Sequence, residues 1–268
     1  MTDFIILVFS GALVGFAIGL TGVGGGSLMT PILLLLGYPA PVAIGTDLLY
    51  AAVTKGSGVY FHQRKKNINW RVMALLAAGS IPLSIAISLF VIDDELRSSE
   101  DYESVMTVFL GIMLILTSLV ITFQKQIQRR LLPGQLFDQS SGTSRQDKAT
   151  LTMTVVLGIL LGVCVTFTSV GAGAIGAAIL FLFYPGWKAR SVVGTDIAHA
   201  VPLTLVAGLG YLFNDLVDLT LLFSLLAGSL PGIYLGTHVG SLFPDKVMRG
   251  ILISALLLLG LYFTLLHQ

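Results

Sequence analysis

Long runs of apolar residues, separated by short polar stretches, extend along almost the whole chain. Most of these runs reach the roughly 20 residues that a helix needs to cross a bilayer. The ten apolar segments cover residues 4–21, 25–37, 42–61, 70–92, 103–123, 150–168, 174–185, 190–213, 216–238 and 247–266. The second and the seventh are short, and each follows a glycine-rich run that interrupts a helix. This pattern predicts an all-α polytopic membrane protein.

The composition agrees with a membrane protein and argues against other classes. Hydrophobic residues make up 55% of the 268 residues and charged residues 11%, whereas soluble domains carry roughly 25% charged residues. Because so few polar atoms cannot cover an aqueous surface, most of the exterior must face lipid. A net charge of +1 argues against nucleic-acid binding. The sequence has no nucleophile or metal motif typical of an intramembrane enzyme, so we expect a protein that is not an enzyme and needs no cofactor.

The basic residues predict how the segments are oriented. Lys and Arg accumulate in short cytoplasmic loops, and thirteen of the 15 fall on one side if the segments alternate. These thirteen are Arg64, Lys65, Lys66, Arg71, Lys125, Arg129, Arg130, Arg145, Lys148, Lys188, Arg190, Lys246 and Arg249. The distribution predicts that both termini lie outside and that residues 124–149 form a cytoplasmic linker loop.

An internal repeat divides the chain into two membrane halves. The run Gly45-Thr46-Asp47 aligns with Gly194-Thr195-Asp196, and the same shift places residues 78–82 on residues 227–231 without a gap. Each copy holds five segments, an odd number, so the second copy enters the membrane in the opposite sense. The predicted inverted-topology repeats cover residues 1–123 and 150–268. Inverted repeats are common in secondary transporters, which bind substrate near the midplane at broken helices.

Two glycine-rich runs are the candidate substrate-binding regions. Glycine lets a membrane helix unwind where it faces protein or a cavity, and the N–H groups at the start of the next helix favour an anion. The alternative is that these small residues only allow close helix packing, as we expect for Gly11, Gly15 and Gly19. The candidate residues are Thr21, Gly22, Val23, Gly24, Gly25, Gly26 and Ser27 in the first copy, and Thr168, Ser169, Val170, Gly171 and Gly173 in the second.

Each copy also carries a carboxylate inside an apolar segment. Asp47 and Asp196 occupy equivalent positions. An ionised side chain at the bilayer centre costs about 2.5–3.5 kcal/mol, so such residues usually face a cavity or a partner. One interpretation is proton coupling or gating. The other is helix capping, in which Thr46 or Thr195 and the following aspartate bind N–H groups of a first helical turn.

Two further polar residues lie within apolar segments. Lys55 has Thr204 at its equivalent position in the second copy. An ammonium at this depth fits a counter-charge for an anion or an aspartate, and equally a side chain that extends to the inner interface. His199 follows Asp196 by about one helical turn, which fits either a proton relay between them or a packing role.

Three stretches carry a resemblance to a known family. They are Gly19-Leu20-Thr21-Gly22-Val23-Gly24-Gly25-Gly26 with the following Pro31, Ala43-Ile44-Gly45-Thr46-Asp47, and Val193-Gly194-Thr195-Asp196. In these motifs the chain resembles the TauE/SafE sulfite exporter family over nearly its whole length. The resemblance implies export of small sulfur oxyanions or organosulfonates across the plasma membrane. The second copy departs from the first, because Ala174-Ile175 replace Gly25-Gly26 and leave the backbone less free.

The residues and the resemblance lead to the same expected function. We expect a secondary transporter that exports a small anion, such as sulfite or sulfoacetate, by alternating access, with protons as the candidate coupling ion. One alternative is a passive anion channel built on the same repeat. Another is an uptake carrier for sulfate or a different small oxyanion. The expected partners are the anion and the lipid bilayer.

Overall fold

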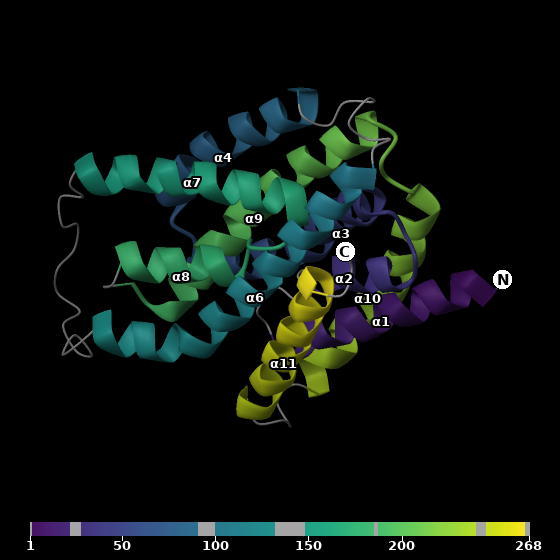
Figure 1. Ribbon diagram of the computed structural model, residues 1–268. Coiled ribbons are helices and arrows are strands. Elements are labelled where there is room, and N and C mark those ends of the chain that lie inside the picture. Colours follow the sequence, from purple (N-terminus) through teal and green to yellow (C-terminus); the bar gives the residue numbers. More distant parts are fainter. Residues whose placement is uncertain are drawn as a thin grey trace.

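The computed structural model describes residues 2–21, 28–90, 100–131, 148–184, 187–239 and 245–265. All regular secondary structure in these ranges is helical (Figure 1). The helices are α1 (Thr2–Thr21), α2 (Met29–Leu35), α3 (Ala40–Arg64), α4 (Trp70–Phe90), α6 (Glu100–Leu131), α7 (Lys148–Thr168), α8 (Ala174–Phe183), α9 (Ala189–Phe213), α10 (Leu219–Val239) and α11 (Asp245–Leu265). Within the described ranges, α4, α6, α7, α9 and α10 are long and apolar enough to cross a membrane. The expected all-α membrane fold is confirmed.

Each predicted apolar segment corresponds to one helix. The second and seventh are short helices, since α2 has 7 residues and α8 has 10. The predicted linker differs at both ends, because α6 continues to Leu131 and α7 begins at Lys148. Residues 124–131 are rich in Gln, Lys and Arg, which are good helix formers, so the helix extends past its apolar segment.

The helices pack mainly in four pairs, α1 with α10, α4 with α7, α3 with α9 and α6 with α11 (Figure 1). Glycines allow the first pair to approach closely. Gly11 contacts Leu225 and Gly15 contacts Ser229, and neither glycine has room for a Cβ atom beside the partner backbone. The order of these contacts shows that α1 and α10 run in the same direction. Close packing at the α1 glycines is therefore confirmed.

The pair α3 and α9 runs in opposite directions. Gly45, near the start of α3, contacts Tyr211 near the end of α9, whereas Gly58 contacts Ile197. These two helices are the third members of the two predicted copies, and α1 packs on α10 as α7 packs on α4. Such a pattern is what two inverted copies would produce. The repeat itself stays a prediction from the sequence.

The exterior and the interior differ sharply in polarity. Large apolar side chains are exposed around the molecule, with Phe213 83% and Phe90 78% exposed, as expected of a surface that faces lipid. Inside, polar side chains of both halves are buried along α3 and α9. Asp47, Lys55 and Asp196 are all less than one-tenth exposed. This polar interior is the candidate functional site.

Candidate functional site

The second glycine-rich run forms a break between α7 and α8. Its backbone enters the left-handed region at Ser169 (φ 57°), Gly171 (φ 112°) and Gly173 (φ 131°), and only glycine adopts the last two conformations readily. The Thr168 hydroxyl accepts the N–H of Val170 at 3.1 Å. The break therefore has a defined shape that depends on its glycines.

Four backbone N–H groups in this break have no acceptor in the described part of the chain. Among the described residues, no acceptor binds the N–H groups of Gly171, Ala172, Gly173 and Ala174. They lie at the start of α8, where the helix dipole is positive. The hydroxyl of Ser169, which is 1% exposed, makes no close hydrogen bond to a described residue, although the Asp47 carboxylate lies near it. Buried donors without acceptors are costly, so this arrangement fits an oxyanion.

Lys55 reaches the same break from α3. Its side chain is 7% exposed, and Nζ donates to the carbonyl oxygen of Ala172 at 3.0 Å. The ammonium also interacts electrostatically with Asp196 and, less strongly, with Asp47. The side chain thus points into the protein and does not extend to the inner interface. It places a positive charge beside the unpaired N–H groups.

The carboxylate of Asp47 binds the first turn of α2. Its Oδ2 atom accepts the N–H of Thr30 at 3.2 Å and the Thr30 hydroxyl at 2.5 Å. The Ser169 hydroxyl lies beside this carboxylate. Capping, one of the two interpretations of the sequence, therefore occurs here, but the capped helix is α2 and not α3, which carries Asp47.

Asp196 lacks a comparable anchor. Ile179 stands at the position equivalent to Thr30. Oδ1 has no partner among the described residues in either carboxylate, but Asp196 also lacks the two bonds that Thr30 gives to Asp47. The carboxylate packs directly against Gly176 of α8, which has no room for a Cβ atom. Its charge interacts with Lys55. The second-copy carboxylate is thus buried, close to the break and less constrained than that of Asp47.

His199 does not bond to Asp196, although one helical turn separates them. Its Nε2 atom lies 2.8 Å from the hydroxyl oxygen of Ser80 in α4. Its Nδ1 atom has no partner among the described residues. His199 therefore joins α9 to α4 across the two halves, as a buried hydrogen-bonded packing residue does.

The threonines of the two Gly-Thr-Asp motifs also join the halves. The Thr195 hydroxyl accepts the N–H of Asn69 at 3.0 Å, and the Thr46 hydroxyl accepts the N–H of Asp218 at 3.3 Å. Asn69 and Asp218 precede α4 and α10, and each also caps the helix that follows it. The two threonines therefore hold the start of a helix in the opposite half.

Similarity to known proteins assigns the family. The family model described as sulfite exporter TauE/SafE matches residues 7–263. The chain belongs to the sulfite exporter TauE/SafE family. Its relatives include the probable membrane transporter protein YjnA of Bacillus subtilis, which is 36% identical over 95% of this chain and 97% of the relative. The probable membrane transporter protein YdhB of the same organism is 30% identical over 88% of this chain and 90% of that relative. The probable membrane transporter protein MJ0441 of Methanocaldococcus jannaschii is 26% identical over 97% of this chain and 95% of that relative. No solved structure matches significantly.

As a member of the TauE/SafE family, the chain is a membrane transporter. Of the site residues expected from the sequence, the break at residues 168–173, Lys55, Asp47 and Asp196 lie together. Thr46, Thr195 and His199 form contacts between the halves. In the first glycine-rich run, Thr21 ends α1, whereas residues 22–27 lie outside the described residues.

Sequence reasoning overlooked three residues of the candidate site. Thr30 binds Asp47, but its equivalent in the second copy is an apolar residue, so comparison of the two copies did not mark it as a polar site. Ala172 contributes only its carbonyl oxygen, which any residue could supply. Ser80 could have been found, because Ser229 stands at its equivalent position within matching Ala-Gly-Ser runs.

Proposed function

We propose that this TauE/SafE family member is a secondary transporter that exports a small oxyanion, sulfite or an organosulfonate such as sulfoacetate, across the plasma membrane. The observation that carries the proposal is the break at residues 168–173. There, buried N–H groups that have no acceptor among the described residues lie next to the ammonium of Lys55. The name of the family supports a sulfur oxyanion as the substrate.

The donors at the break suit the geometry of an oxyanion. A sulfite or sulfonate group presents three oxygen atoms, which can accept hydrogen bonds from several adjacent N–H groups and from the Ser169 hydroxyl. Lys55 supplies the counter-charge, which a neutral solute would not use. The buried position explains how the anion would be stripped of water and still be hydrogen-bonded.

Protons are the proposed coupling ion, and Asp196 is the proposed proton carrier. With both carboxylates ionised, Asp47 and Asp196 outweigh the single charge of Lys55 and repel an anion. A proton on Asp196, whose Oδ1 has no partner in the described part of the chain, removes this repulsion. Anion binding and protonation of Asp196 then favour each other. Transport of an anion whose own charge does not change with pH is therefore expected to rise as the pH falls.

The two threonine contacts are the proposed gates. Thr195 with Asn69 and Thr46 with Asp218 join the halves at separate places. Rocking of one half against the other would break one contact while the other stays closed, which gives alternating access.

Flux in proteoliposomes tests the proposal. The purified protein is reconstituted, and the flux of sulfite, sulfoacetate and sulfate is measured with and without a pH gradient. Sulfoacetate and sulfate separate coupling from titration of the substrate, because sulfite itself binds a proton near neutral pH. We expect saturable flux and counterflow of sulfite or sulfoacetate, accelerated by acid on the side where the anion binds.

Other outcomes would favour the alternatives. Linear, voltage-driven flux without counterflow would identify a passive anion channel. Saturable flux of sulfate alone would favour an uptake carrier for that class of oxyanion. If none of the three anions moves, the sulfur-oxyanion assignment is wrong.

A further inference from the structure

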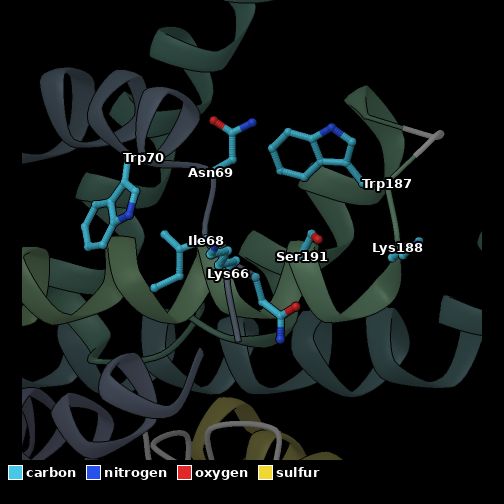
Figure 2. Close-up of a pocket in the computed structure, with 8 residues that line it drawn as sticks. Lys66, Ile68, Asn69, Trp70, Trp187, Lys188 and Ser191 are labelled. Carbon is cyan, nitrogen blue, oxygen red and sulfur yellow. The ribbon is translucent and has the colours of Figure 1, made fainter. Parts of the chain in front are cut away.

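A second polar region lies where the loop between α3 and α4 meets the start of α9. It is a pocket of about 660 Å³, here termed the basic mouth (Figure 2). Its lining residues are Lys66, Asn67, Ile68, Asn69, Trp70, Trp187, Lys188 and Ser191. The lining has two lysines and no carboxylate, and neither lysine forms an ion pair with a described residue. The pocket therefore carries positive charge that its own walls do not neutralise.

Two long helices begin at the basic mouth and add to this positive charge. The 21-residue α4 starts at Trp70, and the 25-residue α9 starts at Ala189, next to Lys188. Each brings the positive end of its dipole to the pocket. Within the described part of the chain, no acceptor binds the N–H of Ala189. Lysine charges and helix dipoles thus act in the same direction at this site.

The equivalent region of the other half supplies its own anions. Ala40, the equivalent of Ala189, begins α3 and donates its N–H to Oε1 of Glu103 at 3.0 Å. Asp215 and Asp218 stand there in place of a lysine and an asparagine. These three acidic residues are here termed the acidic mouth. The same backbone arrangement is therefore neutralised by protein carboxylates on one side, whereas on the other no carboxylate of a described residue lines the pocket.

We propose that the basic mouth binds an external oxyanion group, a sulfonate, sulfate or phosphate, in the role that Glu103 fills at the acidic mouth. Two sources offer this chemistry, a dissolved anion and the phosphate of a phospholipid headgroup. The site is separate from the break at residues 168–173. It could be occupied whether or not the proposed transport is correct.

The walls of the basic mouth suit such a ligand. The Trp187 ring stacks on Tyr184, with ring centroids 4.5 Å apart, and forms a fixed apolar wall. In Figure 2 the Asn69 amide lies between the indoles of Trp70 and Trp187, where it can hydrogen-bond an oxygen of the ligand. The N–H of Asn69 binds Thr195, so a bound anion would lie next to a contact that joins the two halves.

Tryptophan fluorescence reports this pocket directly. The chain has two tryptophans, and both line the basic mouth. The full-length protein is placed in phosphatidylcholine nanodiscs, and its emission is followed while sodium sulfate or sulfoacetate is added at constant ionic strength. A second set of nanodiscs contains phosphatidylglycerol. We expect a saturable change in emission with at least one of these ligands.

Matched variants assign the response to the lysines. The double variant Lys66→Gln/Lys188→Gln should weaken the apparent affinity by at least about tenfold. Lys65→Gln removes a neighbouring charge that does not line the pocket and should retain the wild-type affinity. If the double variant fails to fold, the single variants replace it, since both side chains are exposed.

Each outcome of the titration decides for or against the site. A response to dissolved anions in phosphatidylcholine, lost in the double variant, supports the site with a dissolved ligand. A response to phosphatidylglycerol, lost in the same variant, supports it with a lipid headgroup. No response to any ligand, or an equal response in the double variant, overturns the proposal. Because the readout is binding, a failure of flux through the protein would not affect this test.

Discussion

The two Gly-Thr-Asp motifs occupy equivalent positions in α3 and α9, yet their carboxylates have different surroundings. Asp47 is bonded twice to Thr30 of α2. Asp196 packs against Gly176 of α8 and accepts no hydrogen bond from a described residue, while Oδ1 of each carboxylate has no partner there. Both carboxylates interact electrostatically with the ammonium of Lys55. One copy of a repeated framework therefore anchors its carboxylate to a neighbouring helix, and the other copy leaves its carboxylate available for the proposed proton coupling.

A similar division separates the basic mouth from the acidic mouth. At the acidic mouth, Glu103 accepts the N–H of Ala40, the first residue of α3. At the basic mouth, the equivalent N–H of Ala189 has no acceptor in the described part of the chain. In both comparisons the backbone arrangement agrees and the side-chain charges differ. Function is therefore expected at Asp196 and at the basic mouth, the less satisfied member of each pair.

The largest expected effect is that of Asp196→Asn on transport driven by a pH gradient. The amide cannot bind the coupling proton, so net driven flux should fall by about a hundredfold, which corresponds to about 2.7 kcal/mol. Anion exchange should persist, because the neutral amide imitates protonated Asp196. Counterflow and driven flux are measured on the same vesicles, which separates loss of coupling from loss of folded protein.

Asp47→Asn is the matched control for that experiment. We expect it to lower the thermal stability of the protein but to keep the pH response of the remaining flux, since Asp47 binds α2. Retention of pH-driven flux in both variants, or loss of the pH response in Asp47→Asn alone, would contradict the proposed role of Asp196.

The next largest effect should come from Thr30→Val. This change removes the hydroxyl bond to a buried carboxylate and leaves the backbone N–H bond in place. A hydrogen bond to a charged group contributes about 1.5–3 kcal/mol. We expect the free energy of unfolding in detergent to fall by about 2 kcal/mol. In the control Thr204→Val, the lost hydroxyl binds only carbonyl oxygens of its own helix. A loss equal to that of the control would show that Thr30 does not anchor Asp47.

The elements of the fold could be predicted because they depend on local sequence. An apolar run of helix length in a membrane leaves few alternatives to a helix, and glycines spaced four residues apart, such as Gly11 and Gly15, mark a close contact. The end of α6 was missed for a related reason. Hydropathy marks where the apolar segment ends, whereas the helix continues through polar residues with good helix propensity.

The partners within the site were much harder to predict. The sequence placed Asp47, Asp196 and Lys55 inside the membrane, but the bond from Thr30 to Asp47 depends on how α2 packs against α3. The spacing of Asp196 and His199 suggested that these two side chains interact. Packing of α9 against α4 instead places the Ser80 hydroxyl within hydrogen-bond distance of His199. Tertiary contacts between distant segments decide such bonds, and local periodicity carries no information about them.

A smaller effect is expected from the two threonines that join the halves. Thr195→Val leaves the N–H of Asn69 without its acceptor, which costs about 1 kcal/mol, and should loosen the basic mouth. A cysteine placed at Ile68 should then react with a maleimide about fivefold faster, the factor that 1 kcal/mol provides. The native Cys164 is buried and gives little background.

Thr46→Val should have the reciprocal effect at the acidic mouth. A cysteine at Val217, the position equivalent to Ile68, should react faster in this variant and at the wild-type rate in Thr195→Val. Equal acceleration at both cysteines in either variant would mean that the contacts stabilise the protein as a whole and do not act as separate gates.

The smallest expected effect is that of Glu103→Gln on stability. The amide oxygen can still accept the N–H of Ala40, so only the interaction of the charge with the α3 dipole is lost, about 0.5 kcal/mol at low ionic strength. Added salt should reduce the difference, because Glu103 is exposed and screening acts on it directly. Asp215→Asn is the control, since Asp215 does not cap the α3 N–H. Thermal unfolding of both variants at low and high salt measures the difference. A loss that salt does not change would show that Glu103 acts through packing, and the acidic mouth would then no longer be the neutralised counterpart of the basic mouth.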